Sequence, residues 1–476
     1  MHASEGIELM RCARLGAVLL LIAASIAGLG QASAQTLPAA LVHAYQNNPQ
    51  LNAQRSATRA TDENVAIALG GYRPRVTGTA SLSEVYLDSL SKSTSIFGTT
   101  YSRQAGENVV QTYGLTTTQT LFNGFQTGNR TRQAEAQVFA ARETLRVAEQ
   151  TVLLNAATAY MNLLRDAAIL ELQRSNVNVL EATLRQTRDR FNVGEVTRTD
   201  VAQAESRLAA GRSQLLTAES NYVTSKATYR QVIGVEPGKL VAATPVDRLS
   251  PPNLAGAAAR ASTEHPTITA AAYSVDVAVF QVKIAEGALY PTVTVQGSVQ
   301  KQFGSATNLS NLESLSAAVA GQVSVPIYQG GGEYATIRQA KETLGQRRLD
   351  LDTAREQIQA TVTQAWGQLQ AAKAQIEATQ AQVAAAEIAL NGVREEARVG
   401  QRTTLDVLNA QQDLVNARVA LVTAQRDRVV ASYTVLAAVG SLSPQILGLR
   451  IPIYDPVVHY HQIRDSWFGV RAPDGR

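Results

Sequence analysis

Apolar residues recur at seven-residue intervals along two very long stretches of the chain. In residues 333–398, and again in residues 126–191, the interval is broken once by an eleven-residue step and then resumes. A seven-residue repeat is typical of helices that pack side by side, and the eleven-residue step locally relaxes their left-handed supercoil. We therefore predict two long helices, each roughly 100 Å at 1.5 Å per residue, which fit a bundle or a tube better than a compact globule. The apolar positions are Val138, Leu145, Val152, Leu163, Leu170, Val177 and Leu184 in one stretch and Ile337, Leu344, Leu351, Ile358, Leu369, Ile376, Val383 and Leu390 in the other.

Shorter segments alternate between apolar residues and small or polar ones. Three valines after Pro291 share one face of an extended segment, residues 315–327 alternate similarly, and another such segment follows Pro74. Period-2 segments of about ten residues with one small or polar face are a weak signature of outer-membrane strands. A single half-buried hairpin of an ordinary globular protein has the same pattern, so the alternation alone does not decide. We expect two pairs of strands, one in each half of the chain.

The layout of the chain is written twice. The skeleton of "FNVGEVTRTDVAQAESRL" (191–208) returns 206 positions later in "ARVGQRTTLDVLNAQQDL". The matched residues are Gly194 with Gly400, Thr197 with Thr403 and Asp200 with Asp406. Pro74 and Pro291, ahead of the strand pairs, lie 217 positions apart, so the first half carries eleven extra residues between about 84 and 120. We expect this excess in a loop, residues 87–107, that is exposed outside the cell.

The repeated motif predicts a turn between two helices. Each long helix would end near Gly194 or Gly400, because glycine suits the left-handed conformation that follows many helix C-termini. Thr-x-x-Asp, which begins at Thr197 and at Thr403, is a capping box for the next helix. Each half would thus contribute one helical hairpin, with both tips at one end of the molecule and the strands at the other.

These elements divide the chain into five segments. Residues 1–34 are predicted to be a signal peptide, because an apolar run precedes the cleavage pattern Ala-Ser-Ala at 32–34, with translation starting at Met1 or Met10. The other segments are a first repeat of helix, strand pair and long helical hairpin (35–236), an inter-repeat crossover rich in proline (237–265), a second repeat (266–443) and a C-terminal extension (444–476). We expect the extension to wrap around the middle of the tube or to be partly mobile.

Composition excludes several classes of function. The 43 basic and 39 acidic residues are scattered, which gives a nucleic-acid partner little support. The one cysteine, Cys12, lies in the predicted signal peptide, so the exported chain would have no disulfide. His459 and His461 are interpreted as an exposed pair and not a metal site, because a third ligand is missing. We predict no catalytic residues, no cofactor, no metal and, after the signal peptide, no apolar run long enough for a transmembrane helix.

Four strands cannot close a membrane barrel, because the smallest bacterial barrels have eight, so several copies of the chain must share one. The signal peptide, the duplicated layout, "LFNGF" (121–125) and the "VGxxTxxDVxxA" tips resemble the TolC family of outer-membrane efflux and type I secretion channels, over about residues 36–444. The resemblance implies a mainly α fold with a small β part. Duplicated helical hairpins would form a trimeric α-barrel tunnel in the periplasm, and the strands a shared twelve-stranded transmembrane β-barrel in the outer membrane. Such a homotrimer docks onto an inner-membrane transporter through a periplasmic adaptor, and the transporter chooses the cargo, drugs or protein.

The same resemblance implies roles for residues at the tips. Asp406 matches one acidic ring of the periplasmic entrance, and Asn409 stands at the second ring position, which would make this entrance less acidic. Arg402 matches an arginine that ties the closed tip to the neighbouring hairpin, with Asp200 as its partner. The tyrosine that supports this latch is replaced by Ala397, so the latch would be weaker. The simpler reading of Asp200 and Asp406 is that each carboxylate only completes a capping box.

Two alternatives to an export duct stay open on the sequence. A periplasmic coiled-coil adaptor or structural protein would explain the long helices, although adaptors of that kind lack two strand pairs ahead of two separate helical halves. An exported enzyme is disfavoured because no catalytic constellation is present. Fractionation of the outer membrane and heat-modifiable migration would separate the first alternative from a channel.

Overall fold

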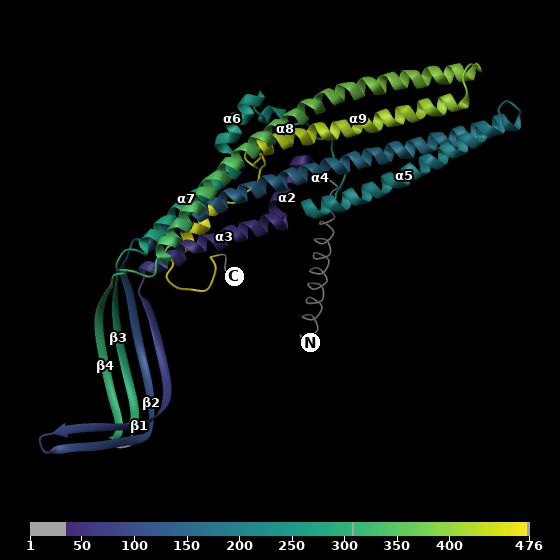
Figure 1. Ribbon diagram of the computed structural model, residues 1–476. Helices are drawn as coiled ribbons and strands as arrows, with labels where there is room; N and C mark the ends of the chain where they lie inside the picture. Colours follow the sequence, from purple (N-terminus) through teal and green to yellow (C-terminus); the bar gives the residue numbers. More distant parts are fainter. Residues whose placement is uncertain (1–34, 307–308, 474–476) are drawn as a thin grey trace, which may run out of the picture. The chain divides into compact units, whose positions relative to one another are not determined.

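The computed structural model describes residues 35–306 and 309–473, and the predicted signal peptide lies outside this part. The chain is mainly helical, with one antiparallel sheet (Figure 1). The elements are α2 (Leu37–Asn47), α3 (Pro49–Leu69), η1 (Gly70–Tyr72), β1 (Arg75–Ser95), β2 (Gly98–Asn123), α4 (Gln126–Asn192), α5 (Arg198–Ile233), η2 (Asp247–Leu249), α6 (Leu254–Glu264), α7 (Pro266–Gly287), β3 (Thr292–Ala306), β4 (Leu309–Ser324), α8 (Gly332–Arg398), α9 (Thr404–Ala438) and α10 (Pro456–Ile463).

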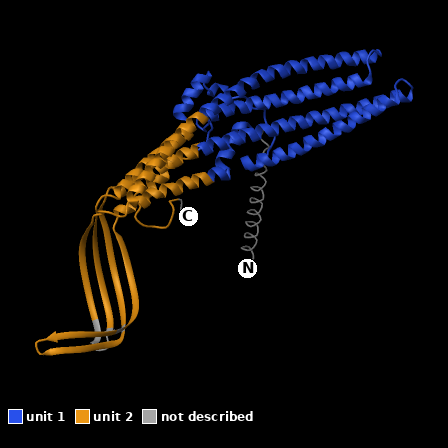
Figure 2. Ribbon diagram, viewed as in Figure 1, with its two compact units in different colours: residues 1–52, 147–265, 358–453 blue, residues 53–146, 266–357, 454–476 orange. Residues whose placement is uncertain are grey.

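The described residues form two compact units (Figure 2). Unit 1 holds residues 35–52, 147–265 and 358–453, and unit 2 holds residues 53–146, 266–357 and 454–473. Each unit takes segments from both sequence repeats. The repeats at 35–236 and 266–443 therefore describe a duplication in the sequence, and their boundaries do not coincide with those of the compact units.

The two long helices are confirmed. α4 and α8 each have 67 residues, and neither contains a proline. The predicted start of the first helix is correct and its predicted end differs by one residue. α5 and α9, the shorter return helices, have 36 and 35 residues. The apolar seven-residue repeat was sufficient to predict helices of this length because every heptad presents a side chain for burial.

The core of unit 1 is made where these helices pack along one another. Near the tips, a cluster of buried residues joins α4 and α5 to Leu408 of α9. A second cluster joins α8 and α9 to the small residues Ala257 and Ala261 of α6. Predicted heptad positions, Val177 and Leu184 in one cluster and Leu369 in the other, are among the buried residues. The helices thus bury narrow stripes and leave wide polar faces exposed, as expected for helices in a tube.

The sheet in unit 2 has, within residues 35–306 and 309–473, four strands in the order β1-β2-β3-β4. All neighbours are antiparallel. β2 of the first repeat pairs with β3 of the second, from Asn123 opposite Thr292 outward. The strand pairs of the two repeats are therefore one continuous sheet, which confirms four strands in the described part of the chain.

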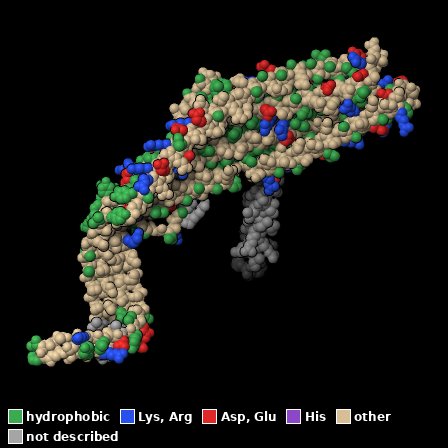
Figure 3. All heavy atoms as spheres, in the orientation of Figure 1, with side chains coloured by type: hydrophobic (Ala, Val, Ile, Leu, Met, Phe, Trp, Pro, Cys, Tyr) green, Lys and Arg blue, Asp and Glu red, His purple; other side chains and the backbone are tan. Residues whose placement is uncertain are grey.

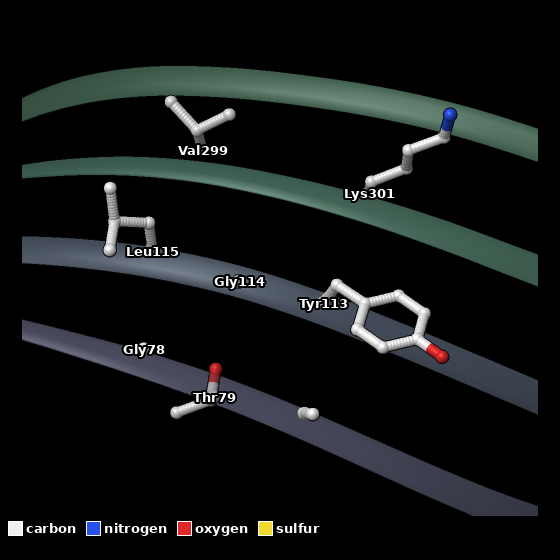
Figure 4. Close-up of a pocket in the computed structure, with 8 residues that line it drawn as sticks. Gly78, Thr79, Tyr113, Gly114, Leu115, Val299 and Lys301 are labelled. Atoms are coloured by element: carbon white, nitrogen blue, oxygen red, sulfur yellow. The ribbon is translucent and has the colours of Figure 1, made fainter.

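The two faces of this sheet differ in polarity. Register places Leu115 opposite Val299 and Tyr113 opposite Lys301 on one face (Figure 4). That face carries mostly apolar residues, Val76, Gly78, Ala80, Leu82, Tyr113, Leu115, Val293, Val295, Gly297, Val299, Leu315, Ala317, Val319, Gly321 and Val323, with Gln111, Thr117, Gln119 and Lys301 among them. The other face carries mostly polar residues, Thr77, Thr79, Ser81, Thr112, Thr116, Thr118, Thr294, Gln296, Ser298, Gln300, Ser316 and Gln322, with Val110, Gly114, Ala318 and Ala320 among them. Strands that have one apolar and one polar face can separate an apolar medium from a water-filled interior.

The extra residues of the first half lengthen two strands and do not form a loop, so the prediction of a loop at 87–107 is wrong. β1 and β2 have 21 and 26 residues, against 15 and 16 in β3 and β4, and they stay paired up to Ser95 opposite Gly98. Arg103 and Asp88 form a two-pronged ion pair across the strands, with the guanidinium Nε 2.9 Å from one carboxylate oxygen. The sequence did not predict this hairpin, because its many serines and threonines show no alternation of apolar and polar residues. Threonine nevertheless favours strands.

One helical stretch in the described part, Leu254–Gly287, is long and apolar enough to cross a membrane by length and composition alone. It contains Arg260, Glu264, Asp276, Lys283 and Glu286, so it is not the uninterrupted apolar run whose absence was predicted. The backbone is extended at His265, with φ −70° and ψ 124°, and divides the stretch into α6 and α7.

Gly124 permits a close approach of two backbones in unit 2. Its φ is +62°, and a Cβ at this position would lie 2.2 Å from the carbonyl oxygen of Gly287. Its match in the second repeat, Gly330, also has a positive φ of +75°, but a Cβ there would meet no atom within 4 Å. A side chain would therefore strain the backbone at either position, but it would overlap other atoms only at Gly124.

We predict that Gly124→Ala destabilises the protein more than Gly330→Ala does. A left-handed alanine costs roughly 1–2 kcal/mol at either site, and overlap with Gly287 adds about 1–3 kcal/mol at position 124 only. Thermal unfolding of both purified variants, followed by circular dichroism, measures the difference. Equal loss of stability would show that the approach of residues 124 and 287 can relax.

Candidate functional site

The two hairpin tips in unit 1 have the same backbone geometry. Gly194 and Gly400 have φ of +81° and +82°. In each turn, the N–H that follows the glycine donates to a carbonyl five residues earlier, from Glu195 to Arg190 and from Gln401 to Glu396, both at 2.9 Å. This bond and the left-handed glycine define a Schellman motif, which satisfies carbonyls that the helix leaves without partners. The tip is therefore a tightly fixed turn.

A capping box starts the return helix at each tip. The carboxylate of Asp200 accepts bonds from the N–H of Thr197 at 2.9 Å and from its hydroxyl at 2.7 Å. The N–H of Asp200 donates in turn to that hydroxyl oxygen at 3.3 Å. Asp406 and Thr403 repeat the arrangement, with 3.0, 2.8 and 3.3 Å. At each tip these reciprocal bonds satisfy two amides at the start of the return helix, those of the threonine and the aspartate.

The same bonds perturb the two carboxyl groups. Hydrogen bonds from the hydroxyl and then the N–H of Thr197 hold the pKa of Asp200 below its ordinary value. For Asp406, the N–H and then the hydroxyl of Thr403 lower the pKa, and the charge of Arg402 lowers it further. Both tips therefore present an ionised carboxylate at neutral pH.

The side chain of Arg402 contacts a residue of its own hairpin and does not contact Asp200 of the same chain. Its Nε is 2.8 Å from a carboxylate oxygen of Glu396, and this contact raises the pKa of the guanidinium. At the first tip, Arg190 and Glu195 form the corresponding local pair at 3.0 Å. Within one chain, the structure does not bring the two predicted latch residues together. A latch between them has to be made with a neighbouring copy and in competition with Glu396.

Asn409 is engaged by a residue that the sequence did not single out. An Nη of Arg207 in α5 donates to its side-chain oxygen at 2.6 Å and so joins the two hairpins of the protomer. Leu408, next to it, is buried among residues of α4 and α5. Arg207 was missed because its match in the second repeat is Asp413, so no repeated motif marks the position.

Ion pairs at matched positions hold the helices of each hairpin. Arg212 binds Glu181 at 2.8 Å in the first, and Arg418 binds Glu387 at 2.7 Å in the second, each pair 206 positions from the other. Their side chains are about half exposed, so they contribute little to stability. Their repetition shows instead that both hairpins use one helix register.

The described residues offer no group of three or more His, Cys, Asp or Glu side chains that could hold a metal ion. The prediction that His459 and His461 form an exposed pair is wrong for His459. Its Nδ1 lies 3.1 Å from the buried carboxylate of Asp62, and its side chain is 12% exposed. α10 turns only one of the two histidines toward solvent, because alternate residues on a helix point in different directions.

The model of the outer membrane efflux protein family matches residues 40–235 and 258–441. The chain belongs to this family. It is 42% identical over 465 residues to the outer membrane efflux protein BepC of Brucella suis, and the match covers 98% of each chain. It is 27% identical over 329 residues to the outer membrane protein TolC of Escherichia coli, covering 66% of each. Among solved structures, the CmeC outer membrane channel of Campylobacter jejuni matches with a TM-score of 0.74 at 16% identity, covering 90% of this chain and 89% of that one.

Family membership confirms the resemblance on which the tip residues were first assigned. It also confirms the predicted place in the outer membrane and the prediction that the chain is a channel protein and not an enzyme. The periplasmic adaptor and the exported enzyme are thereby excluded. The roles of individual tip residues are separate questions, because no relative assigns them to this chain.

Lowering the pH should fray both tips. Because the pKa values of Asp200 and Asp406 are depressed in the folded state, their stabilisation is complete above the unfolded value of about 3.9 and is lost as the pH falls through the folded values. Amide hydrogen exchange at residues 197–200 and 403–406, corrected for intrinsic rates, should be constant from neutral pH to about pH 4 and should rise below it. A rise already near pH 6 would contradict this assignment.

Removing a capping threonine should have the same effect at neutral pH. Thr197→Ala or Thr403→Ala loses roughly 1 kcal/mol of local stability, which corresponds to about fivefold faster exchange at the affected tip. Thr217→Ala is the matched control, since Thr217 is an exposed threonine inside α5 that bonds only to the carbonyl of Ser213.

Proposed function

We propose that the chain is the outer-membrane exit duct of a tripartite efflux pump or type I secretion system, assembled as a homotrimer. The observation that carries this proposal is the open sheet of unit 2. Its outer strands, β1 and β4, have no partner on their outward edges in the part of the chain that the structure describes. Hydrocarbon cannot satisfy free backbone amides, so a sheet in a membrane has to be closed. Three copies, with β4 of one beside β1 of the next, give a closed barrel of twelve strands.

An uncharged band across the sheet supports its place in a bilayer. Residues 76–83, 108–123, 292–300 and 314–324 contain no Asp, Glu, Lys or Arg. In register these segments lie side by side. The segments in β3 and β4 have the 9–11 residues of a tilted membrane strand, the one in β1 is one residue shorter and the one in β2 is longer. In the view of Figure 3, charged side chains gather at the far end of the sheet, where β1 and β2 continue beyond the other strands.

Aromatic residues mark the other boundary of this band. One exposed aromatic side chain stands near each junction between a strand and a helix, and the residues are Tyr72, Phe125, Tyr290 and Tyr328. The Phe125 ring lies edge-on to that of Tyr290, with centroids 6.5 Å apart. Aromatic girdles of this kind lie at the membrane–water interface. We place the periplasmic face of the outer membrane at these residues.

The relatives favour efflux over protein secretion. The efflux protein BepC is 42% identical to this chain, whereas the alkaline protease secretion protein AprF of Pseudomonas aeruginosa is 25% identical over 422 residues. In either system the duct would work with a periplasmic adaptor and an inner-membrane transporter. We propose no nucleic-acid partner and no cofactor for this function.

The tips in unit 1 would form the gated entrance. We assign Asp406 to a ring of three carboxylates, one per protomer, which favours cations at a constriction. Asn409 adds no charge to a second ring and is held by Arg207. We keep Arg402 and Asp200 of neighbouring hairpins as the closed-state latch, with Glu396 as the local alternative partner of Arg402 when the latch opens.

Sedimentation of the purified protein in detergent tests the shared barrel. We expect a trimer that heat dissociates into monomers, since closure of the barrel requires strands from several chains. A stable monomer, with its sheet intact by circular dichroism, would overturn the proposed function.

Single-channel recording tests the latch. Arg402→Ser and Asp200→Asn should raise the open population by about tenfold, the effect expected from losing three weak symmetric ion pairs. Asparagine at 200 is chosen because its side-chain oxygen can still accept the capping bond. Glu396→Gln removes only the competing partner and should leave the resting channel closed.

Asp406→Asn provides the control for charge at the entrance. It should leave closure unchanged and relieve block by a trivalent cation. If Arg402→Ser and Glu396→Gln open the channel equally, the local pair at the second tip keeps the entrance shut and Asp200 has no part in it.

A further inference from the structure

The C-terminal extension is fastened to unit 2. α10 packs on α3 and α4, where Tyr460 contacts the buried cluster of Val65, Ala134 and Val138. Ile463, the last residue of α10, is also buried. These apolar contacts hold α10 against α3 and α4. That the extension wraps around the middle of the tube or is partly mobile stays a prediction.

Polar contacts fix the orientation of α10. His459 bonds to the carboxylate of Asp62, whose side chain is only 1% exposed. The guanidinium of Arg142 lies 5.1 Å from the centre of the Tyr460 ring, a cation–π contact. The chain that follows α10 therefore starts from a well-defined point.

Arg73 holds the next residues beside the start of the sheet. One of its Nη atoms lies 2.5 Å from the carbonyl oxygen of Ser466, and its guanidinium lies 4.7 Å from the centre of the Trp467 ring. β1 begins two residues later, at Arg75. Figure 1 shows this segment in yellow, close to the helix ends from which the strands start. Trp467 is therefore at the level of the aromatic girdle that contains Tyr72.

The side chains presented there are large, apolar and without a cover. Trp467 is 67% exposed, Phe468 94% and Val470 fully exposed. Exposed aromatic groups of this size next to one another are unusual on a surface that faces only water. The segment itself carries Arg464, Asp465 and Arg471, and Arg73 beside it adds a further positive charge.

We propose that residues 464–473, here called the C-terminal arm, lie in the headgroup region of the periplasmic leaflet and bind phospholipid. This rests on the proposed function, which places the sheet in the outer membrane. Tryptophan is favoured at the depth of lipid headgroups, because its ring is apolar and its N–H needs a polar partner. Phe468 and Val470 reach toward the acyl chains, and the arginines bind phosphate oxygens.

The position of the arm beside the aromatic girdle indicates that its partner is lipid. Through its contacts with Arg73, the arm adds exposed aromatic residues next to Tyr72, one of the aromatic residues at the strand–helix junctions. Its combination of aromatic and basic side chains matches a surface of phosphates above hydrocarbon. A second copy of this chain packed against the arm is the alternative occupant that the experiment has to exclude.

Fluorescence of Trp467 reports the position of the arm directly. The chain has two tryptophans, Trp366 and Trp467, so Trp366→Phe leaves one reporter. The full-length variant is reconstituted into vesicles of phosphatidylethanolamine and phosphatidylglycerol whose acyl chains carry bromine near the headgroup. We expect emission at shorter wavelength than in water and marked loss of intensity through bromine quenching. Bromine near the chain end should quench less.

Two matched controls separate failure of the arm from failure of the proposed function. Trp467→Phe leaves Trp366, which packs beside the cluster of α6, α8 and α9 in unit 1, and should not be quenched. Leu315→Trp, with both native tryptophans replaced by phenylalanine, reports from the uncharged band of β4 and should be quenched strongly. Quenching of a tryptophan at 315 without quenching of Trp467 would refute lipid binding by the arm and would leave the proposed barrel unaffected. No quenching at either site overturns the proposed function.

Arg73 distinguishes lipid from a neighbouring chain. Arg73→Ala removes the bond to Ser466 and the contact with Trp467, so quenching should fall, and Arg73→Lys should restore part of it. If Trp467 emits at short wavelength but bromine does not quench it, a protein surface covers the arm and the proposal is wrong.

Discussion

The fold depends on one constraint, which is that every backbone amide of a sheet in hydrocarbon needs a partner. The described chain supplies one sheet with two open edges, at β1 and β4, so it cannot meet this constraint alone. Duplication helps, because the strand pairs of the two halves join through β2 and β3, so that one chain would supply a third of the proposed barrel. The uncharged band and the two unlike faces then follow, since the same strands have hydrocarbon on one side and water on the other.

Much of this arrangement was readable in the sequence because it is periodic. Heptads placed α4 and α8 within a residue or two, and glycine followed by Thr-x-x-Asp placed both turns, since each signal is local. The extended hairpin at 87–107 was not predicted, because its serines and threonines lack apolar alternation. The partners of Arg402, Asn409 and His459 escaped for another reason: they depend on how helices are rotated about their axes, which a repeat in one chain does not specify.

The two repeats share a backbone conformation between strand and helix but have different side chains there. Gly124 and Phe125 correspond to Gly330 and Gly331, and all four have positive φ. Phe125 adopts a conformation that is strained for a residue with a side chain; its ring packs edge-on to Phe122, with centroids 5.2 Å apart, and faces Tyr290. Ring packing at the girdle offsets the strain in the first repeat, whereas the second repeat uses glycine and needs no such packing. The backbone conformation is thus the same in both repeats, whereas only the first repeat has an aromatic side chain at this position.

Charges at the tips follow the same logic. Arg190 of the first tip corresponds to Glu396 of the second, so the local pairs Arg190–Glu195 and Glu396–Arg402 have opposite polarity along the chain. Arg207 corresponds to Asp413, and only the first of these reaches across to the other hairpin. Both tips keep the capping carboxylate, Asp200 or Asp406, but only the second has an arginine, Arg402, between its glycine and its capping threonine. Two capping carboxylates that meet repel each other, whereas an arginine and a carboxylate attract. An attractive contact between unlike tips therefore depends on the arginine that the first tip lacks, while the turns that build both tips stay identical.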